Sequence, residues 1–150
     1  MQKLNLPVYD FKIRTEKGKD LIFDIIRKKY VVLTPEEWVR QNFVQFLIHE
    51  KKYPKSLMAL EKRLLVNSQP QRFDMVIYNR KGQPHIIIEF KSPSVKISQN
   101  TFDQVVRYNM ALKVKYILVS NGMHHFACEI DYEKNNYSYL KDIPVFPDLL

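Results

Sequence analysis

The sequence predicts an α/β or α+β fold in which helices flank a mixed β-sheet, in the order helix, three strands, helix, two strands. Two observations support this prediction. Short apolar segments rich in β-branched residues, each bounded by turn residues, recur between residues 56 and 130 and have the length of strands. Two longer segments, near residues 35–51 and 99–112, place their apolar residues at the spacing of one helical face.

An N-terminal β extension, residues 1–29, is expected before this core. Residues 11–15 alternate between apolar and polar, a glycine lies at position 18, and residues 21–26 are mostly apolar, which together predict a β-hairpin. The basic triplet at residues 27–29 allows contact with phosphates, but a solvated strand edge is the favoured interpretation.

The first core helix is predicted to begin after Thr34, which suits the N-cap position. Pro35 suits the first helical position, and Glu37 is expected to complete a capping box with Thr34. The helix should end near residues 51–54. Its predicted apolar stripe consists of Val39, Phe43, Phe46 and Leu47.

Three strands are predicted to follow this helix. Residues 56–66 form the first, although part of this segment also fits a helix, and residues 67–70 form a turn. Residues 72–78 and 85–91 are the other two strands, and the turn residues 79–84 join them as a hairpin. This hairpin holds the candidate site, because charged residues end an otherwise apolar strand.

Charged side chains of the hairpin are predicted to meet on one face. Alternation along a strand points Glu89 and Lys91 to the face opposite that of the intervening Phe90. If the loop is residues 80–83, the register sets Asp74 opposite Glu89, with Cβ atoms about 4.5–5.5 Å apart. Two carboxylates so close repel each other unless a divalent cation is shared between them. A slip of one residue would turn Asp74 away, and the competing interpretation is a capped, solvated strand end.

The second helix is predicted at residues 99–112, with Gln104 and Tyr108 one turn apart on its flank. After it, residues 115–120 and 124–130 are predicted to be two strands joined by a tight Asn-Gly turn. The tail, residues 131–150, is polar and aromatic, and its prolines limit regular structure.

The composition limits which class of protein this chain can belong to. With 150 residues, 45% of them hydrophobic, the chain is expected to be one globular domain with its core at residues 30–130. It has no apolar run of membrane-spanning length and no signal-peptide pattern, and the single cysteine, Cys128, suits a reducing cytoplasm. The 24 basic and 16 acidic residues give a net charge of +8. This charge favours a protein that binds nucleic acid; the alternative is a basic protein that has no such partner.

The motifs, taken in order, resemble a nuclease superfamily. Asp74, the hairpin and the triplet Glu-Phe-Lys at residues 89–91 are similar to the pattern of PD-(D/E)xK nucleases. Residues 33–41, LTPEEWVRQ, and the Q-x-x-x-Y pattern within residues 101–109 resemble the N-terminal domains of type I restriction enzyme R subunits and their stand-alone relatives. The resemblance covers about residues 30–130 and implies a restriction-endonuclease-like core of the order αβββαβ.

This resemblance implies a nuclease that hydrolyses phosphodiester bonds in DNA and leaves a 5′-phosphate and a 3′-hydroxyl. It implies that Asp74, Glu89 and the backbone carbonyl of Phe90 bind Mg²⁺ or Mn²⁺. It also implies that Lys91 positions or helps to deprotonate the attacking water and stabilises charge on the phosphate.

Five further residues each have two interpretations. Glu37 is either an additional carboxylate beside the metal or only a helix cap. Gln104 and Tyr108 either have a functional role, which is to hold the substrate backbone or to orient Lys91, or merely flank a helix. Arg40 and Arg107 either bind phosphate groups of the nucleic acid or carry surface charge.

Other chemistries are poorly supported by the sequence. The adjacent His124 and His125 would point to opposite sides of a strand, and one distant cysteine does not complete a zinc site. The chain contains no G-x-x-x-x-G-K-[ST] loop, so the resemblance covers only the nuclease part of a restriction subunit. The alternative function is a catalytically silent module that binds nucleic acid or assembles with a separate motor or specificity subunit. Expected protein partners are a second copy or restriction-system subunits.

Overall fold

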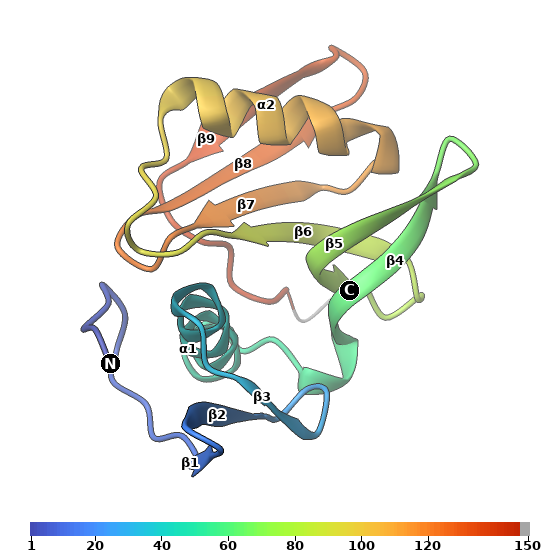
Figure 1. Ribbon diagram of the computed structural model, residues 1–150. Helices are drawn as coiled ribbons and strands as arrows, with labels where there is room; N and C mark the ends of the chain where they lie inside the picture. Colours follow the sequence, from blue (N-terminus) through green and yellow to red (C-terminus); the bar gives the residue numbers. More distant parts are fainter. Residues whose placement is uncertain (148–150) are drawn as a thin grey trace.

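The computed structural model describes residues 1–147, which form two β-sheets and two α-helices (Figure 1). The three-stranded antiparallel sheet holds β1 (Ile13–Glu16), β2 (Lys19–Asp24) and β3 (Lys29–Val32). The six-stranded sheet has the order β4-β5-β6-β7-β8-β9, and among these strands only β6 and β7 run parallel. Its strands are β4 (Met58–Val66), β5 (Gln69–Tyr78), β6 (Pro84–Phe90), β7 (Tyr116–Ser120), β8 (His125–Asp131) and β9 (Asn136–Leu140). The fold is therefore α+β with a mixed central sheet.

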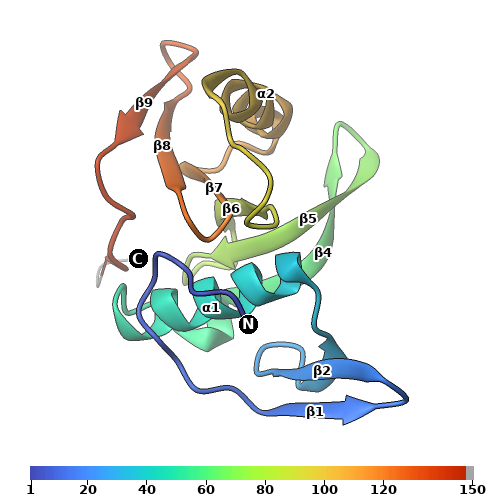
Figure 2. The same ribbon diagram turned by 60° about the vertical axis from the view of Figure 1, so that its left-hand side comes forward.

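The two helices cover opposite faces of the six-stranded sheet. Helix α1 (Pro35–His49) packs on one face and separates that sheet from the three-stranded sheet (Figures 1 and 2). Helix α2 (Gln99–Asn109) crosses the other face, and connects the parallel strands β6 and β7. Helices on both faces explain why the strands between them have long apolar runs.

The predicted N-terminal hairpin is confirmed by β1 and β2, whose turn places Lys17 and Gly18 at positive φ. Strand β3 extends it to three strands. In the basic triplet, Lys28 and Lys29 are exposed at this sheet's edge, as a solvated edge requires. Arg27 differs, because it is half-buried and bonded to carboxylates described below.

The first helix begins as predicted. Thr34 is the N-cap, and its hydroxyl accepts the Glu37 N–H at 3.0 Å. The capping box is nevertheless half-formed, since the N–H of Thr34 donates to the Val32 carbonyl and the Glu37 carboxylate bonds elsewhere. The helix ends at His49, slightly before the predicted end.

The chain after the first helix shows three differences from expectation. Strand β4 is confirmed as a strand, but it begins at Met58 instead of residue 56, after a short 3₁₀ turn (Lys55–Leu57). Helix α2 is capped by Ser98, and its predicted last residues 110–112 form a 3₁₀ turn. Strand β9 lies in the predicted tail and pairs with β8, because Asn135 adopts positive φ and closes a hairpin. Residues 148–150 of that tail lie outside the described residues.

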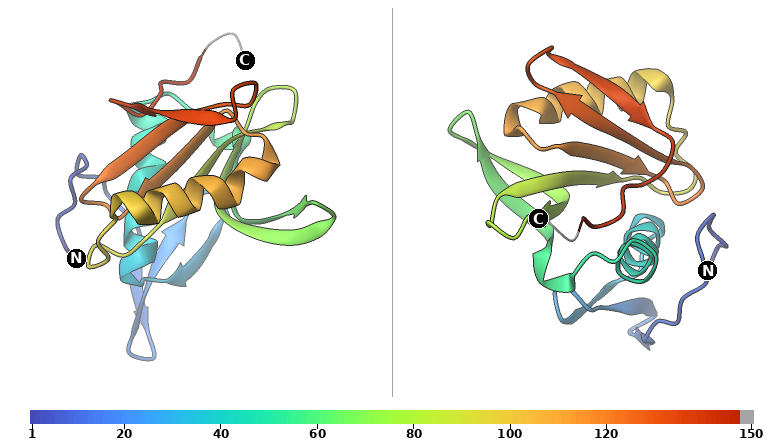
Figure 3. Two further views of the ribbon diagram at one scale, coloured as in Figure 1. Left: turned by 90° about the horizontal axis from the view of Figure 1, so that it is seen from above. Right: turned by 180° about the vertical axis from the view of Figure 1, so that it is seen from behind.

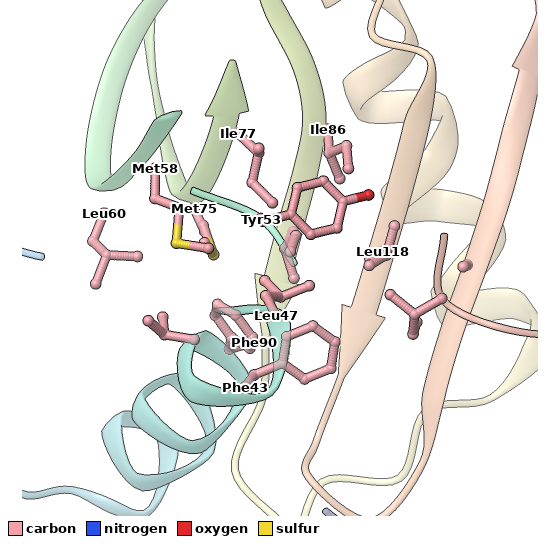
Figure 4. Packing of buried hydrophobic residues seen from close by; sticks show 14 of the residues in the cluster. Phe43, Leu47, Tyr53, Met58, Leu60, Met75, Ile77, Ile86, Phe90 and Leu118 are labelled. Atoms are coloured by element: carbon pink, nitrogen blue, oxygen red, sulfur yellow. The ribbon is translucent and has the colours of Figure 1, made fainter. Parts of the chain in front are cut away.

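Two apolar cores fill the space on either side of the sheet. Figure 4 shows the first, in which Phe43 and Leu47 of α1 pack towards Phe90 of β6. The rings of Phe43 and Phe90 meet edge to face, with centroids 5.6 Å apart. Ile87 belongs to the second core, under α2, which confirms the predicted alternation along β6. No helix within residues 1–147 is long and apolar enough to cross a membrane.

Candidate active site

The register of the central hairpin brings two carboxylates together. Met75 pairs with Ile88 and Ile77 pairs with Ile86, so the next step along both strands sets Asp74 opposite Glu89. The predicted register is thus confirmed where the site lies. It changes at the other end of the hairpin, where a bulge after Ile77 shifts the pairing by one residue. The four-residue loop assumed for the prediction is therefore wrong, since Tyr78 and not Asn79 pairs with Pro84, and the bulge compensates for the difference before the strands reach the two carboxylates.

Asp74 is half-buried and close to other acids. Burial raises the pKa of its carboxyl to about 6, the Phe90 N–H counteracts this rise, and the charges of Glu36 and Glu89 add to it. The Phe90 N–H donates to Asp74 Oδ2 at 2.8 Å and fixes the carboxylate beside the end of β6. An acid held in this way, against like charges, is suited to a cation.

Glu36 is the acid of the first helix that acts on Asp74, although the sequence analysis selected its neighbour Glu37. A signal was present in the helical period. Glu36 lies three residues before Val39 and seven before Phe43, so it continues the sheet-facing stripe towards the N-terminus of α1. Its side chain is exposed there, at the open end of the stripe.

Lys91 follows β6 directly and lies beside Glu89. Its ammonium Nζ is 3.4 Å from Glu89 Oε1, and both side chains are about one-third exposed. The Lys91 N–H donates to the Ser120 carbonyl at 2.9 Å, which prolongs the β6–β7 pairing past the assigned strand end. The backbone that carries Lys91 is thus held by the sheet, while its side chain reaches solvent next to the carboxylates.

A shallow hollow of about 60 Å³ connects the carboxylates with the second helix. Tyr108 of α2 borders it and is 67% exposed. The other predicted residues of this helix, Gln104 and Arg107, are exposed and do not border it. The hollow is lined by Gln71, Arg72, Phe73, Asp74, Ile87, Ile88, Glu89, Tyr108 and Asn109. The structure therefore gathers Asp74, Glu89 and Tyr108, with Lys91 adjacent.

Glu37 and Arg40 form a buried ion pair instead of facing the hollow. Arg40 Nη2 lies 2.6 Å from Glu37 Oε1, and both side chains are 7% exposed. Arg27 approaches the same carboxylate at 2.9 Å, and Gln41 donates to it at 3.0 Å. Burial would raise the pKa of Glu37, but these partners outweigh it and lower that pKa. A metal ion at Glu37 would have to displace two arginines.

The ion pair of Glu37 and Arg40 is linked to charged residues of the central sheet. Arg40 Nη1 lies 2.5 Å from Glu61 of β4, and Arg72 Nε of β5 lies 2.5 Å from the same carboxylate. At its other end Arg27 bonds Asp24 of β2 at 2.5 Å. We call this chain of alternating charges the ion ladder; it consists of Asp24, Arg27, Glu37, Arg40, Glu61 and Arg72. It joins the three-stranded sheet, α1 and the six-stranded sheet.

The donor set at the site fits a hard cation better than zinc. Within residues 1–147 no group of three or more His, Cys, Asp or Glu side chains is placed to hold a metal. Magnesium is commonly bound through one or two carboxylates and water, whereas zinc sites use at least three protein ligands. His125 is occupied, since its ring nitrogens bond Ser120 at 2.7 Å and the Asn5 carbonyl at 2.9 Å.

Comparisons with known proteins identify the family and the fold. The family described as "Type I restriction enzyme R protein N terminus (HSDR_N)" matches residues 35–144, from the start of α1 to beyond β9. A solved chain described as a fragment of an HsdR subunit of a type I restriction enzyme from Vibrio vulnificus YJ016 is similar in fold, with a TM-score of 0.51 at 19% identity. The similarity covers 75% of this chain and 24% of that chain, so this chain spans about a quarter of its length. No curated protein matches the sequence.

Proposed function

We propose that this chain, which belongs to the family of type I restriction enzyme R protein N termini, is a metal-dependent nuclease. It would cut DNA with a restriction-endonuclease-like core. The observation that carries the proposal is the constellation of Asp74, Glu89 and Lys91 at the end of one hairpin. A protein that only binds DNA has no need of a half-buried carboxylate whose pKa is raised by burial and by neighbouring acids.

Asp74 and Glu89 would hold Mg²⁺ or Mn²⁺, together with the backbone carbonyl of Phe90. A bound divalent ion would polarise the scissile phosphate and lower the pKa of a bound water. Asp74 is already oriented for this role by the Phe90 N–H, which occupies one carboxylate oxygen and leaves the other for a cation. Glu36 adds negative charge at the same place from the N-terminus of α1.

Lys91 would supply the positive charge that acts on the substrate. Its ammonium lies on the face of Glu89 and reaches solvent, so it can contact a water or a non-bridging phosphate oxygen. Tyr108 borders the hollow from α2 and can donate a hydrogen bond to a neighbouring phosphate. Gln104 and Arg107, exposed on the same helix, would contact the DNA backbone further out.

A binding module without turnover is the second candidate. One observation favours it: binding to a polyanion requires only an excess of basic residues, and the chain has 24 basic and 16 acidic residues. Such a module would bind DNA through its net charge of +8 and would rely on other restriction-system subunits for catalysis.

A cleavage assay separates the two candidates. Supercoiled and linear duplex DNA are incubated with the protein in Mg²⁺ or Mn²⁺, and EDTA is the control. The nuclease produces nicked or shortened DNA that disappears with EDTA. DNA that is bound but remains intact in either metal would favour the binding module.

We expect Mn²⁺ binding to depend on the two opposed carboxylates. Calorimetry should show affinity at least tenfold weaker in Asp74→Asn and in Glu89→Gln, because residues that merely orient ligands already contribute 10–100-fold. Glu129→Gln is the matched control, since this β8 carboxylate is 45% exposed and pairs only loosely with Lys115, at 3.9 Å. Equal affinity in all three variants and the parent would rule out the metal site.

A further inference from the structure

The β4–β5 hairpin extends beyond the rest of the six-stranded sheet. Strands β4 and β5 pair from Met58–Ile77 out to Val66–Gln69, whereas β6 pairs with β5 only from Met75 to Tyr78. The outer part, residues 62–72, is therefore a two-stranded ribbon, which projects past α2 in Figures 1 and 3. Asp74 lies two residues from its base. We call residues 62–72 the ribbon.

The ribbon has one face on the protein and one in solvent. Leu64 and Val66 are half-buried against the core under α2. The opposite face carries the directly paired Arg63 and Arg72 and, one step further out, Leu65 with Pro70. Arg63 is exposed, the Arg72 side chain is 60% exposed and Leu65 is 70% exposed. The free face is thus available to a partner.

The charge of the ribbon selects the kind of partner. Residues 62–72 contain three basic and no acidic residues. The two arginines are held side by side although they repel each other, and Glu61 just below them binds Arg72 at 2.5 Å. Because like charges directly opposite on neighbouring strands are destabilising, a polyanion that contacts both relieves this repulsion.

We propose that the ribbon lies in the major groove of duplex DNA, beside the phosphate that a divalent ion at Asp74 and Glu89 would bind. The inference rests on the proposed function, and names the form of the substrate. The major groove is about 12 Å wide and admits a two-stranded β-ribbon. Six residues from Asp74 to the tip span about 20 Å at 3.3 Å each, or about six base pairs at 3.4 Å. Arg63 and Arg72 contact phosphates near the base of the ribbon, while the polar tip, Asn67 to Gln69, faces base edges.

A duplex fits this face better than a single strand. Proteins that bind single strands without sequence preference stack the bases on aromatic side chains. The free face of the ribbon presents arginine, leucine and proline. Residues 62–72 include no aromatic residue, and the adjacent Phe73 is 4% exposed and lies in the core. The ribbon can therefore contact DNA through the groove and through the phosphates, but not by stacking on bases.

Fluorescence polarisation in EDTA, with a 20-base-pair duplex and the matching single strand, tests the proposal without requiring cleavage. Arg63→Glu should weaken duplex binding by roughly tenfold or more, and Arg63→Ala should reduce the slope of log affinity against log salt by about 0.9. Arg63→Lys should retain most of the affinity, because the phosphate charge is still met. Arg72 is left intact, since its replacement would also disturb the ion ladder.

Lys17→Glu is the matched control, with the same charge change at an exposed turn of the three-stranded sheet, on the far side of α1 (Figure 1). Equal losses in Lys17→Glu and Arg63→Glu, unchanged affinity in Arg63→Glu, or tighter binding of the single strand would each overturn the ribbon proposal. Circular dichroism confirms that the exposed substitutions leave the fold intact. If the parent cuts DNA in Mg²⁺ and Arg63→Glu binds like the parent, the ribbon proposal alone fails. If the parent neither binds nor cuts DNA, the proposed function fails as well.

Discussion

Replacing Lys91 by alanine is expected to slow DNA cleavage by about 10²–10⁴-fold while Mn²⁺ binding stays nearly the same. The ammonium lies 3.4 Å from Glu89 and is not a metal ligand, so its loss removes a contact that matters when charge develops on the phosphate. DNA affinity should fall only slightly, since one of 24 basic residues is lost. Single-turnover cleavage and calorimetry on the same samples measure both quantities.

Two further variants sharpen this experiment. Lys91→Arg should not restore the full rate, because the guanidinium keeps its charge but does not exchange a proton at neutral pH. Lys115→Ala removes a lysine that is 54% exposed beside Glu129, and should cut DNA like the parent. A parent that cuts DNA no faster than Lys91→Ala would show that Lys91 has no catalytic role.

The hairpin at the site could be predicted because its determinants are local. The alternation of Ile86 to Phe90 predicted the faces correctly, but the loop assumed at residues 80–83 is wrong, since Tyr78 and not Asn79 pairs with Pro84. The bulge after Ile77 was not foreseen, and it offsets this error, because equal steps from the pair of Tyr78 and Pro84 would otherwise set Asp74 opposite Ile88. Strand β9 was missed, since it depends on pairing with β8 and on positive φ at Asn135.

The roles of charged residues on α1 could not be predicted from the same local rules. The capping box explained Glu37 within its own helix, but three of the residues that bond it or continue its ion ladder, Arg27, Glu61 and Arg72, come from other elements. Nothing in a single sequence shows which of its 24 basic residues lie within reach of a given carboxylate. Tertiary packing thus buried Glu37 and left Glu36 exposed, where its charge acts on Asp74.

The ion ladder also explains how the site keeps its shape. Glu61 adopts a φ of +52°, in the left-handed region that costs roughly 1–2 kcal/mol for a residue with a side chain. The β4–β5 pairing is interrupted at this point, between Leu60–Met75 and Lys62–Phe73, directly opposite Asp74. Arg40 and Arg72 hold the Glu61 carboxylate from two elements. They neutralise a third acid that would otherwise add to the repulsion around Asp74.

Arg40→Ala is therefore expected to destabilise the protein by about 3 kcal/mol, at the lower end of the range for breaking a buried pair. Glu37 and Glu61 would lose a shared partner, although Arg27 and Arg72 remain beside them. At this chain length the melting temperature should fall by about 6–12 °C. Arg40→Lys should recover only part of the loss, because one ammonium cannot bond both carboxylates as the guanidinium fork does.

The loss of stability in Arg40→Ala is expected to depend on pH because of Glu37. Its pKa is lowered in the folded protein, so its ion pairs contribute stability above the ordinary pKa of a glutamate, and that contribution is lost as the pH falls through the lowered value. The difference between Arg40→Ala and the parent should thus be full at pH 7 and shrink in acid. Arg14→Ala is the matched control, since its pair with Glu16 is more than half exposed on both sides and should change the stability by less than about 0.5 kcal/mol. If thermal melts at pH 7 show Arg40→Ala as stable as Arg14→Ala, the ladder contributes nothing to the fold. Both roles first predicted for Arg40, phosphate binding and surface charge, are wrong in any case, because its side chain is buried between Glu37 and Glu61.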